Sequence, residues 1–404
     1  MSLTRPITRS LTRAITRALT APGSGGGFAE YVHIFSYGQS LSVGERSTPV
    51  QNSTSRFDTV SFVGGVRALD TLTSPSAYAS FIPLVENTGG PNSAASYGNI
   101  LTPGETPLFG ACAAINERNS GRDYRLIGTA SGFGATSITN LSKGTTPYNR
   151  MLGEVTSAKA LADAEGKGYR VGGILWLQGE WDLANATYST QLQTLASDLD
   201  ADIRAITGQS ESVPLVSYQT RGGFAVAKQQ LAAALASPLV HIGSPVYFCT
   251  FHPDNIHLDG PGIELAGAHL GRALSTLLQG GSWDFVRPLS VSFAGTYIDI
   301  LMNVPVAPLV IDTTTISNPG FNGFSIFNPS MVAKAATVSI VSSTTIRLTT
   351  AETITAGWTV NYQNSQSVNR GNIRDSAGTL DRYDPDGRDA PLNNWAVAFE
   401  VVTT

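Results

Sequence analysis

From about residue 30 to residue 280, short continuous apolar runs alternate with longer stretches whose apolar positions recur at helical spacing. The runs predict buried strands and the stretches predict helices. Strands are expected at 31–37, 124–129, 172–177, 214–218 and 240–243, and helices at 108–116, 151–165, 190–206, 226–236 and 262–278. This alternation predicts an α/β fold, a parallel sheet with helices on both faces.

After Trp283 the helical spacing disappears. Short segments rich in β-branched residues follow, separated by turns rich in Gly, Asn, Pro and Ser; they lie at 290–300, 337–340, 345–348 and 358–362. Such segments predict a small β-sandwich. We therefore expect a domain boundary at 282–288, with an α/β domain at 28–282 and a β-sandwich domain at 283–404.

The first twenty residues carry a repeat of an apolar residue, Thr, Arg and a small residue. Its spacing of four aligns Leu3, Ile7, Leu11, Ile15 and Leu19 along one stripe. A stripe this short cannot bury itself, so residues 1–27, which end in a Gly-rich linker, predict a docking or oligomerisation segment. The alternative is a disordered basic tail.

Composition excludes several classes of protein. The chain is 42% hydrophobic and 14% charged, which suits a folded protein with a large core. A net charge of -4 without a basic patch predicts no nucleic-acid partner. No apolar run reaches 18 residues, which predicts no membrane insertion, and the Arg-rich start is no signal peptide. Cys112 and Cys249 form no metal or redox motif, and two buried thiols are favoured over a disulfide.

Candidate chemistry begins at Ser40, just past the first expected strand and directly after Gly38 and Gln39. Ligands of open α/β sheets bind at the carboxyl ends of the strands. A serine there suits a nucleophile, and its amide suits an oxyanion hole. The alternative is a serine that serves only as a turn or helix cap.

The second candidate is Asp254, three residues before His257 and close to the last expected helix. An aspartate at this spacing can orient the imidazole while the other ring nitrogen faces a nucleophile. His252 is near enough to compete for the role of base, but it lacks an upstream Asp. A capping Asp beside a surface His is the purely structural alternative.

Two further segments follow expected strands. In the segment 176–182, Gln178 can donate its amide to an oxyanion, and Glu180 and Asp182 can orient Gln178, His257 or a sugar hydroxyl. The two carboxyls also raise the alternative of a glycoside hydrolase, or of simple caps. In the segment 130–137, glycines allow a backbone amide to approach a substrate, and a plain turn is the alternative.

In this order the four segments resemble the SGNH (GDSL-like) hydrolases, in particular their carbohydrate O-acetylesterase branch, which includes sialate O-acetylesterases. The motifs of that branch are Gly-Gln-Ser, Gly-Gly-Thr, Trp-x-Gln-Gly-Glu-x-Asp and Asp-x-x-His. They correspond here to 38–40, 134–136, 176–182 and 254–257. Two departures concern the acyl pocket and the oxyanion geometry: Leu41 stands in place of Asn, and Ala135 in place of the second glycine.

The resemblance implies a flavodoxin-like three-layer esterase domain and acyl transfer to Ser40, with His257 as base and Asp254 orienting it. It implies an oxyanion hole made by the amides of Ser40 and Gly134 and the side chain of Gln178. Gly132 is the alternative to Gly134. The resemblance implies no metal and no cofactor. Gln39, Glu180 and Asp182 are the candidate substrate-binding residues.

The two ends suggest a setting. The Thr-Arg repeat resembles leaders of phage tail proteins, and the β segments resemble Ig-like or Swm-type repeats of surface and phage proteins. We therefore expect a virion enzyme of a phage tail or tailspike, a homo-oligomer and by preference a trimer, that removes O-acetyl groups from a bacterial surface polysaccharide. The alternatives are a non-catalytic receptor-binding tail protein and a glycoside hydrolase acting through Glu180 and Asp182.

Overall fold

A seven-stranded sheet organises the larger part of the molecule in the computed structural model, which describes residues 27–55, 57–67, 75–86, 102–119, 121–364, 371–385 and 387–404. Its spatial order is β3-β2-β4-β1-β5-β6-β7, parallel except between β2 and β3. The strands are β1 (Glu30–Gly38), β2 (Val60–Phe62), β3 (Phe81–Pro83), β4 (Tyr124–Ala130), β5 (Gly168–Leu177), β6 (Leu215–Gln219) and β7 (Val240–Pro245). Without the short edge strands β2 and β3, the chain order is 2-1-3-4-5, that of flavodoxin-like sheets.

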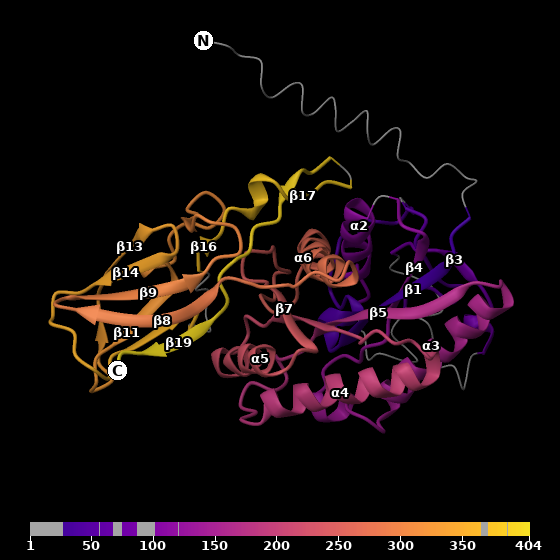
Figure 1. The fold of residues 1–404 in the computed structure, drawn as a ribbon, viewed down its shortest axis with the longest axis horizontal. Helices are drawn as coiled ribbons and strands as arrows, with labels where there is room; N and C mark the ends of the chain where they lie inside the picture. The colour runs from indigo at the N-terminus through magenta and orange to yellow at the C-terminus, as the bar shows by residue number, and fades with distance from the viewer. Residues whose placement is uncertain are drawn as a thin grey trace, which may run out of the picture.

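Helices cover both faces of this sheet (Figure 1). One face carries α2 (Leu108–Arg118) and α6 (Gly260–Leu278), and the other carries α3 (Thr146–Ala164), α4 (Tyr188–Thr207) and α5 (Phe224–Ala236). The predicted α/β fold with a parallel sheet is confirmed. Helix α3 begins five residues earlier than predicted because Pro147 occupies its first turn, where proline is well tolerated.

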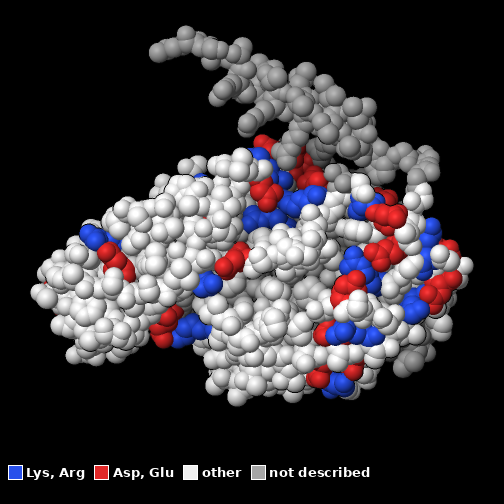
Figure 2. All heavy atoms as spheres, in the orientation of Figure 1, with Lys and Arg blue, Asp and Glu red and all other residues white. Residues whose placement is uncertain are grey.

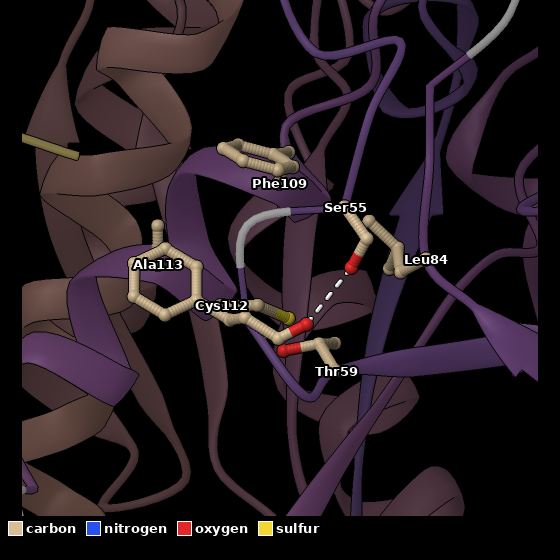
Figure 3. Close-up of a pocket in the computed structure, with 7 residues that line it drawn as sticks. Ser55, Thr59, Leu84, Phe109, Cys112 and Ala113 are labelled. Carbon is tan, nitrogen blue, oxygen red and sulfur yellow. Dashed lines mark hydrogen bonds between the residues drawn. The ribbon is translucent and has the colours of Figure 1, made fainter. Parts of the chain in front are cut away.

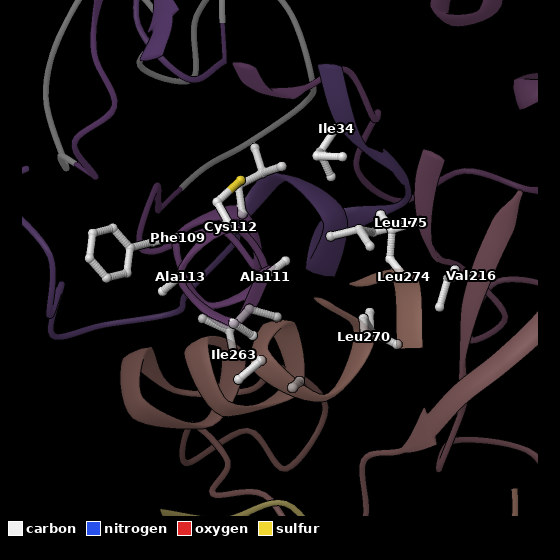
Figure 4. Packing of buried hydrophobic residues seen from close by; sticks show 14 of the residues in the cluster. Ile34, Phe109, Ala111, Cys112, Ala113, Leu175, Val216, Ile263, Leu270 and Leu274 are labelled. Atoms are coloured by element: carbon white, nitrogen blue, oxygen red, sulfur yellow. The ribbon is translucent and has the colours of Figure 1, made fainter. Parts of the chain in front are cut away.

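The helices α2 and α6 approach each other closely because glycines line their contact. A side chain on Gly267 would place its Cβ 2.1 Å from the carbonyl oxygen of Pro107, and one on Gly271 would lie 2.4 Å from that of Ala111. Around this contact, apolar side chains of both helices face those of β1, β5 and β6, including Ile34, Leu175 and Val216 (Figure 4). This packing holds α6, and the loop before it, against the sheet.

The rest of the chain forms two four-stranded antiparallel sheets, in the orders β13-β14-β9-β8 and β12-β11-β15-β19. Their strands are β8 (Arg287–Ala294), β9 (Tyr297–Asn303), β11 (Phe324–Phe327), β12 (Ala333–Lys334), β13 (Thr337–Ser342), β14 (Thr345–Thr349), β15 (Thr359–Tyr362) and β19 (Phe399–Val402). Both sheets contribute to one hydrophobic cluster. The segment 290–300, predicted as one strand, is a hairpin that turns at Gly295, where φ is +56°. The Ig-like or Swm-type identity of this part stays a prediction.

Smaller elements complete the fold. Two short pairs join β10 (Val310–Ile311) to β16 (Ile373–Arg374) and β17 (Arg382–Tyr383) to β18 (Ala390–Pro391). Five 3-10 helices are described: η1 (Ser40–Val43), η2 (Pro75–Tyr78), η3 (Ile138–Leu141), η4 (Phe321–Gly323) and η5 (Ala377–Thr379).

The chain returns to the α/β part after residue 380 (Figure 1). Tyr383 and Leu392 belong to the same hydrophobic cluster as α2 and α6, and the Tyr383 hydroxyl donates a 2.6 Å hydrogen bond to the buried carboxylate of Glu264. Arg118 and Asp381 form an ion pair across the same contact. The change of architecture lies near residue 283, and the two parts share a core. The domain limits 28–282 and 283–404 stay a prediction.

Other expectations concern single residues and the surface. Cys112 and Cys249 are buried and free, as predicted, and burial raises the pKa of the Cys112 thiol to about 12.

In the part of the chain that the structure describes, no helix is long and apolar enough to span a bilayer. On the face seen in Figure 2, acidic and basic side chains alternate over the α/β part. The Thr-Arg repeat and most of its linker lie outside the described residues.

Candidate active site

Ser40 lies at the carboxyl edge of the sheet, where β1 and β5 end side by side. The backbones come so close that a Cβ on Gly38 would lie 2.2 Å from the Leu177 carbonyl oxygen, and Gly38 has a φ of +140°. The Gln39 amide donates to that same oxygen at 2.9 Å, and η1 then begins at Ser40. Strand order reverses between β1 and β5, which is where flavodoxin-like sheets place their ligands.

The three predicted triad residues lie within hydrogen-bond distance of one another. His257 Nε2 is 3.0 Å from Ser40 Oγ, and His257 Nδ1 is 2.8 Å from Asp254 Oδ2. Because an ionised carboxylate only accepts, Nδ1 carries the proton toward Asp254 and Nε2 is left to accept from the Ser40 hydroxyl. This arrangement can take a proton from serine and return it to a leaving group.

A short closed loop sets the geometry of Asp254 and His257. The amides of Ile256 and His257 both donate to Asp254 Oδ1 at 3.0 Å, and Asn255 adopts a left-handed φ of +55°. The His252 amide closes the loop by donating to the His257 carbonyl oxygen at 2.9 Å. The Asp-x-x-His spacing thus forms a turn in which Asp254 both caps the backbone amides and binds the imidazole of His257.

Asp254 is held in its ionised form. Burial raises the pKa of this carboxyl, but hydrogen bonds from the His257 side chain and from the two loop amides outweigh it, and the pKa falls well below its usual range. Arg46 adds a 3.0 Å ion pair to Oδ2. The rival base, His252, has its Nδ1 3.4 Å from Asp254 Oδ2. Since the imidazole that meets Ser40 is that of His257, the geometry favours His257 over His252 as base.

The glycine segment after β4 lies against the nucleophile turn. The amides of Ser131 and Phe133 donate to the carbonyl oxygens of Ser36 and Gly38 at 2.8 and 2.9 Å. A Cβ on Gly132 would come within 2.0 Å of Ser42 Oγ, so packing alone demands glycine there. The next residues, Gly134 and Ala135, follow this contact; Ala135 has a left-handed φ of +50°. The Gly134 amide as an oxyanion donor stays a prediction.

The other two predicted oxyanion donors, Ser40 and Gln178, differ in how their N–H groups are placed. Ser40 opens η1, and the first amides of a helix have no acceptor within it, so the Ser40 amide is suitably placed. Gln178 is fully buried, and its Nε2 donates to the Thr136 carbonyl oxygen at 3.2 Å and to Asp182 Oδ2 at 2.5 Å. Both amide hydrogens therefore have protein acceptors. A contact with an oxyanion requires one of these bonds to be exchanged.

The predicted substrate-binding residues are engaged with the protein itself. Gln39 donates from Nε2 to Glu180 Oε2 at 2.9 Å and accepts from the amides of Gly179 and Trp181. The Glu180 carboxylate also accepts from the hydroxyls of Tyr218 and Thr220. This geometry favours a positioning role for Gln39 over contact with substrate.

Asp182 likewise accepts hydrogen bonds from the protein itself. Besides Gln178 it accepts from the Ile138 amide at 2.8 Å and from Asn185 Nδ2 at 3.0 Å. Its carboxylate thus joins the segment after β5 to η3 and to the loop before α4. A glycosidase needs two carboxyls that flank a sugar bond. Glu180 and Asp182 both accept hydrogen bonds from groups of the protein itself, so the structure does not support the glycoside hydrolase alternative.

Three residues of this region carry no recognisable sequence signal. Arg46 reaches Asp254 from the loop after η1. The Tyr188 hydroxyl lies 2.7 Å from Gln178 Oε1 and 2.8 Å from its carbonyl oxygen, which fixes the orientation of that amide. Trp181 is 60% exposed beside Gln39. Arg46 and Trp181 contact segments far away in the chain, and Tyr188 contacts Gln178 across 10 residues. Local spacing alone does not reveal these contacts.

Two hollows lie elsewhere in the described part of the chain. One of about 10 Å³ lies between Phe109, Cys112 and Thr59, where Ser55 Oγ donates to the Phe57 carbonyl oxygen (Figure 3). It has room for about one water molecule. The other, of about 670 Å³, lies between α6 and the C-terminal part and is lined in part by Arg272 and Trp283. Neither is lined by a triad residue.

Comparison with known proteins bears on this site. Residues 102–276 match the family model described as carbohydrate esterase, sialic acid-specific acetylesterase. The chain carries a carbohydrate O-acetylesterase domain. The matched segment of this esterase includes Gln178, Asp254 and His257, whereas Ser40 lies upstream of it. The assignment of the nucleophile therefore rests on the contact between Ser40 and His257.

Several solved structures are similar to the esterase, and the first named here shares its fold. A carbohydrate acetylesterase from Xanthomonas citri is 14% identical, with a TM-score of 0.57 over 92% of this chain and 80% of that chain. NanS is 10% identical, with a TM-score of 0.44 over 63% of this chain and 99% of that chain. A protein from Arabidopsis thaliana is 17% identical, with a TM-score of 0.45 over 61% of this chain and 98% of that chain. No curated protein matches the sequence.

Proposed function

We propose that the esterase uses Ser40, His257 and Asp254 to remove O-acetyl groups from a bacterial surface polysaccharide. The observation that carries the proposal is the continuous contact from Ser40 Oγ through His257 to Asp254, at 3.0 and 2.8 Å. It joins residues from opposite ends of the α/β part at the edge of the sheet where ligands of this fold bind.

In the first half of the reaction, Ser40 Oγ attacks the carbonyl carbon of the acetyl ester while His257 Nε2 takes its proton. The tetrahedral intermediate then collapses, the bond from the acyl carbon to the sugar oxygen breaks, and His257 returns the proton to that oxygen. The deacetylated glycan leaves, and the acetyl group remains on Ser40. Asp254 stabilises the imidazolium that forms in this step.

In the second half, water attacks the acetyl carbonyl and gives a proton to His257. Collapse of the second intermediate releases acetic acid, which ionises at neutral pH, and Oγ recovers its proton from the imidazolium. The charge on the tetrahedral oxygen is held by the amides of Ser40 and Gly134. Gln178 joins them once one of its two internal bonds is given up. No step needs a metal or an organic cofactor.

The proposed substrate class rests on two kinds of support. The family matched by residues 102–276 consists of carbohydrate esterases and is described as sialic acid-specific, so O-acetylated sialic acid belongs among the candidate substrates. The Thr-Arg repeat in the first twenty residues resembles the leaders of phage tail proteins. A tail protein meets acetylated glycans at the bacterial surface.

The setting is part of the proposal: a phage tail or tailspike protein in the virion, docked through residues 1–27 and assembled as a homo-oligomer, by preference a trimer. Mass spectrometry of purified phage particles tests the location. Light scattering of the full chain, and of a chain that begins at residue 28, tests the assembly. A monomer in both cases would contradict the oligomer.

Acetate release is the experiment that tests the activity. The wild type and Ser40→Ala are compared on p-nitrophenyl acetate, O-acetylated sialic acid and a panel of acetylated bacterial polysaccharides. Release by the wild type and its loss in the variant are expected. No release from any substrate, or equal release by both proteins, would favour a non-catalytic receptor-binding protein. A glycosidase would keep its activity in Ser40→Ala.

A further inference from the structure

Trp181 is exposed to an unusual degree for its type. The chain has five tryptophans, and Trp181 is 60% exposed, whereas Trp176, Trp358 and Trp395 are all buried. Trp283 is half-buried and donates its Nε1 hydrogen to the Ile242 carbonyl oxygen at 2.8 Å. A large aromatic surface left in water forgoes the free energy of burial, which a ligand stacked on the ring would supply.

The exposed ring belongs to a turn that contacts the residue before the proposed nucleophile. The Trp181 amide donates a 3.2 Å hydrogen bond to Gln39 Oε1, and Gln39 directly precedes the proposed nucleophile, Ser40. The path from this amide through one glutamine side chain to Ser40 is on the order of 10 Å. A glycan whose ester reacts with Ser40 would therefore pass close to the turn that carries Trp181.

The turn that presents the ring is held on both sides. The Asp182 amide closes the turn on the Gly179 carbonyl oxygen at 3.0 Å. The carboxylates that flank Trp181 are both tied down, that of Glu180 by the hydroxyls of Tyr218 and Thr220. The backbone turn that carries the indole is therefore held in a fixed conformation. A rigid platform loses little conformational entropy when it binds a ligand.

Two other exposed apolar side chains belong to segments that also carry site residues. Leu183 is two residues beyond Trp181 and Ile256 is directly before His257, and both are exposed, at 43% and 56%. Exposed apolar side chains on the segments that carry a polar triad suit a pyranose, which has one face of C–H groups and polar groups at its edge. An aromatic ring offers the same combination of a flat apolar face and a polar edge.

We propose that Trp181 is a stacking platform for the pyranose ring adjoining the acetylated sugar. This inference rests on the proposed function, since it assumes that a glycan ester reacts with Ser40. It adds a subsite to the esterase: Trp181 binds the neighbouring ring and so favours acetyl groups within a chain of sugars over those on small esters. The platform acts on binding, and its loss raises KM more than it lowers kcat.

The test compares Trp181→Ala with the wild type on an acetylated oligosaccharide and on p-nitrophenyl acetate. We expect the ratio of kcat/KM for the oligosaccharide to that for the small ester to fall about tenfold, mostly through KM, which corresponds to about 1.4 kcal/mol of binding. Trp181→Tyr should restore most of the ratio. Leu235→Ala, which removes an apolar side chain of 58% exposure from α5, is the matched control and should leave the ratio unchanged.

Fluorescence gives a second measurement in the Ser40→Ala background, where substrate binds without turnover. Because Trp181 is the most exposed tryptophan, its emission should shift to shorter wavelength when the oligosaccharide is added, and the shift should vanish when Trp181→Phe is introduced as well. An unchanged kinetic ratio in Trp181→Ala overturns the platform. So does a changed oligomeric state with unchanged kinetics, which would assign Trp181 to a protein interface. Failure of the proposed function is distinct, because the wild type would then release no acetate.

Discussion

Ser40 Oγ and His257 Nε2 lie 3.0 Å apart although 217 residues separate them in the chain. The contact joins the end of β1 to the loop before α6, and α6 is held to the sheet by its close packing on α2. The nucleophile follows the first strand of the α/β part, and its base precedes the last helix of that part. The site therefore depends on the folding of the whole α/β part.

Replacing each of the two neighbouring histidines tests which one is the base. We expect His257→Ala to lower kcat by a factor on the order of 10⁴ or more, because Ser40 loses its proton acceptor. His252→Ala should cost a small fraction of that, since His252 contacts Asp254 from outside the Ser40–His257 pair. Steady-state kinetics on p-nitrophenyl acetate measure both. Equal losses in the two variants would contradict the assignment.

Gln178 distinguishes an oxyanion donor from a purely structural amide. We expect Gln178→Ala to lower kcat on the order of 100-fold or more with little change in KM, because an oxyanion donor acts mainly in the transition state. Asn185→Ala is the control, because it removes a different partner of Asp182 and leaves Gln178 in place. Reduced thermal stability with an unchanged kcat in Gln178→Ala would assign the residue to structure alone.

Ala135 stands in a conformation that favours glycine, with a φ of +50°. A non-glycine residue in the left-handed region costs about 1 kcal/mol, and this cost exceeds what glycine loses through its greater freedom in the unfolded chain. Ala135→Gly should therefore raise the free energy of unfolding by about 0.5 kcal/mol. The exposed mid-helix substitution Ala201→Gly in α4 should lower it by about 1 kcal/mol. Urea unfolding compares them, and a loss of stability in both would refute the strain at Ala135.

Stability should fall as pH rises from 7 to 8.5. Burial, and next the charge of Glu86, raise the pKa of Glu105 to about 8, and burial raises that of Glu86 to about 7. Unfolded glutamate titrates near 4.3, so the folded state binds more protons, and its stability is lost as pH rises through the folded pKa values. Burial lowers the pKa of His33 and His269 below its usual value. Their titration makes stability rise with pH, but only at a lower pH than this range.

Urea unfolding at several pH values between 7 and 8.5 measures this dependence. Glu105→Gln is the matched variant, because it keeps an acceptor for Asn52 and removes the titration. Its stability should change less with pH over this range than that of the wild type. A slope of the same size in both proteins would mean that Glu105 is already ionised in the folded state.

Much of the α/β part could be predicted from local patterns. The apolar runs correctly predicted β1, β4, β5, β6 and β7, because buried strands need continuous apolar residues whatever surrounds them. The edge strands β2 and β3 were missed, since three residues each are too few to show a period. The hairpin of β8 and β9 was predicted as one strand because Gly295 is the only strong turn signal inside it.

The amino-acid sequence determined the chemical types at the site and their order along the chain. Tertiary structure decided which of them meet. It brought Arg46 to Asp254 across 208 residues, gave both amide hydrogens of Gln178 to protein acceptors, and left the Trp181 side chain exposed to water. Motifs and periodicity reflect local backbone preference and burial, whereas a hydrogen-bond partner depends on how distant segments pack. That packing has no local signature, and it separates the residues that can react from those that hold them in place.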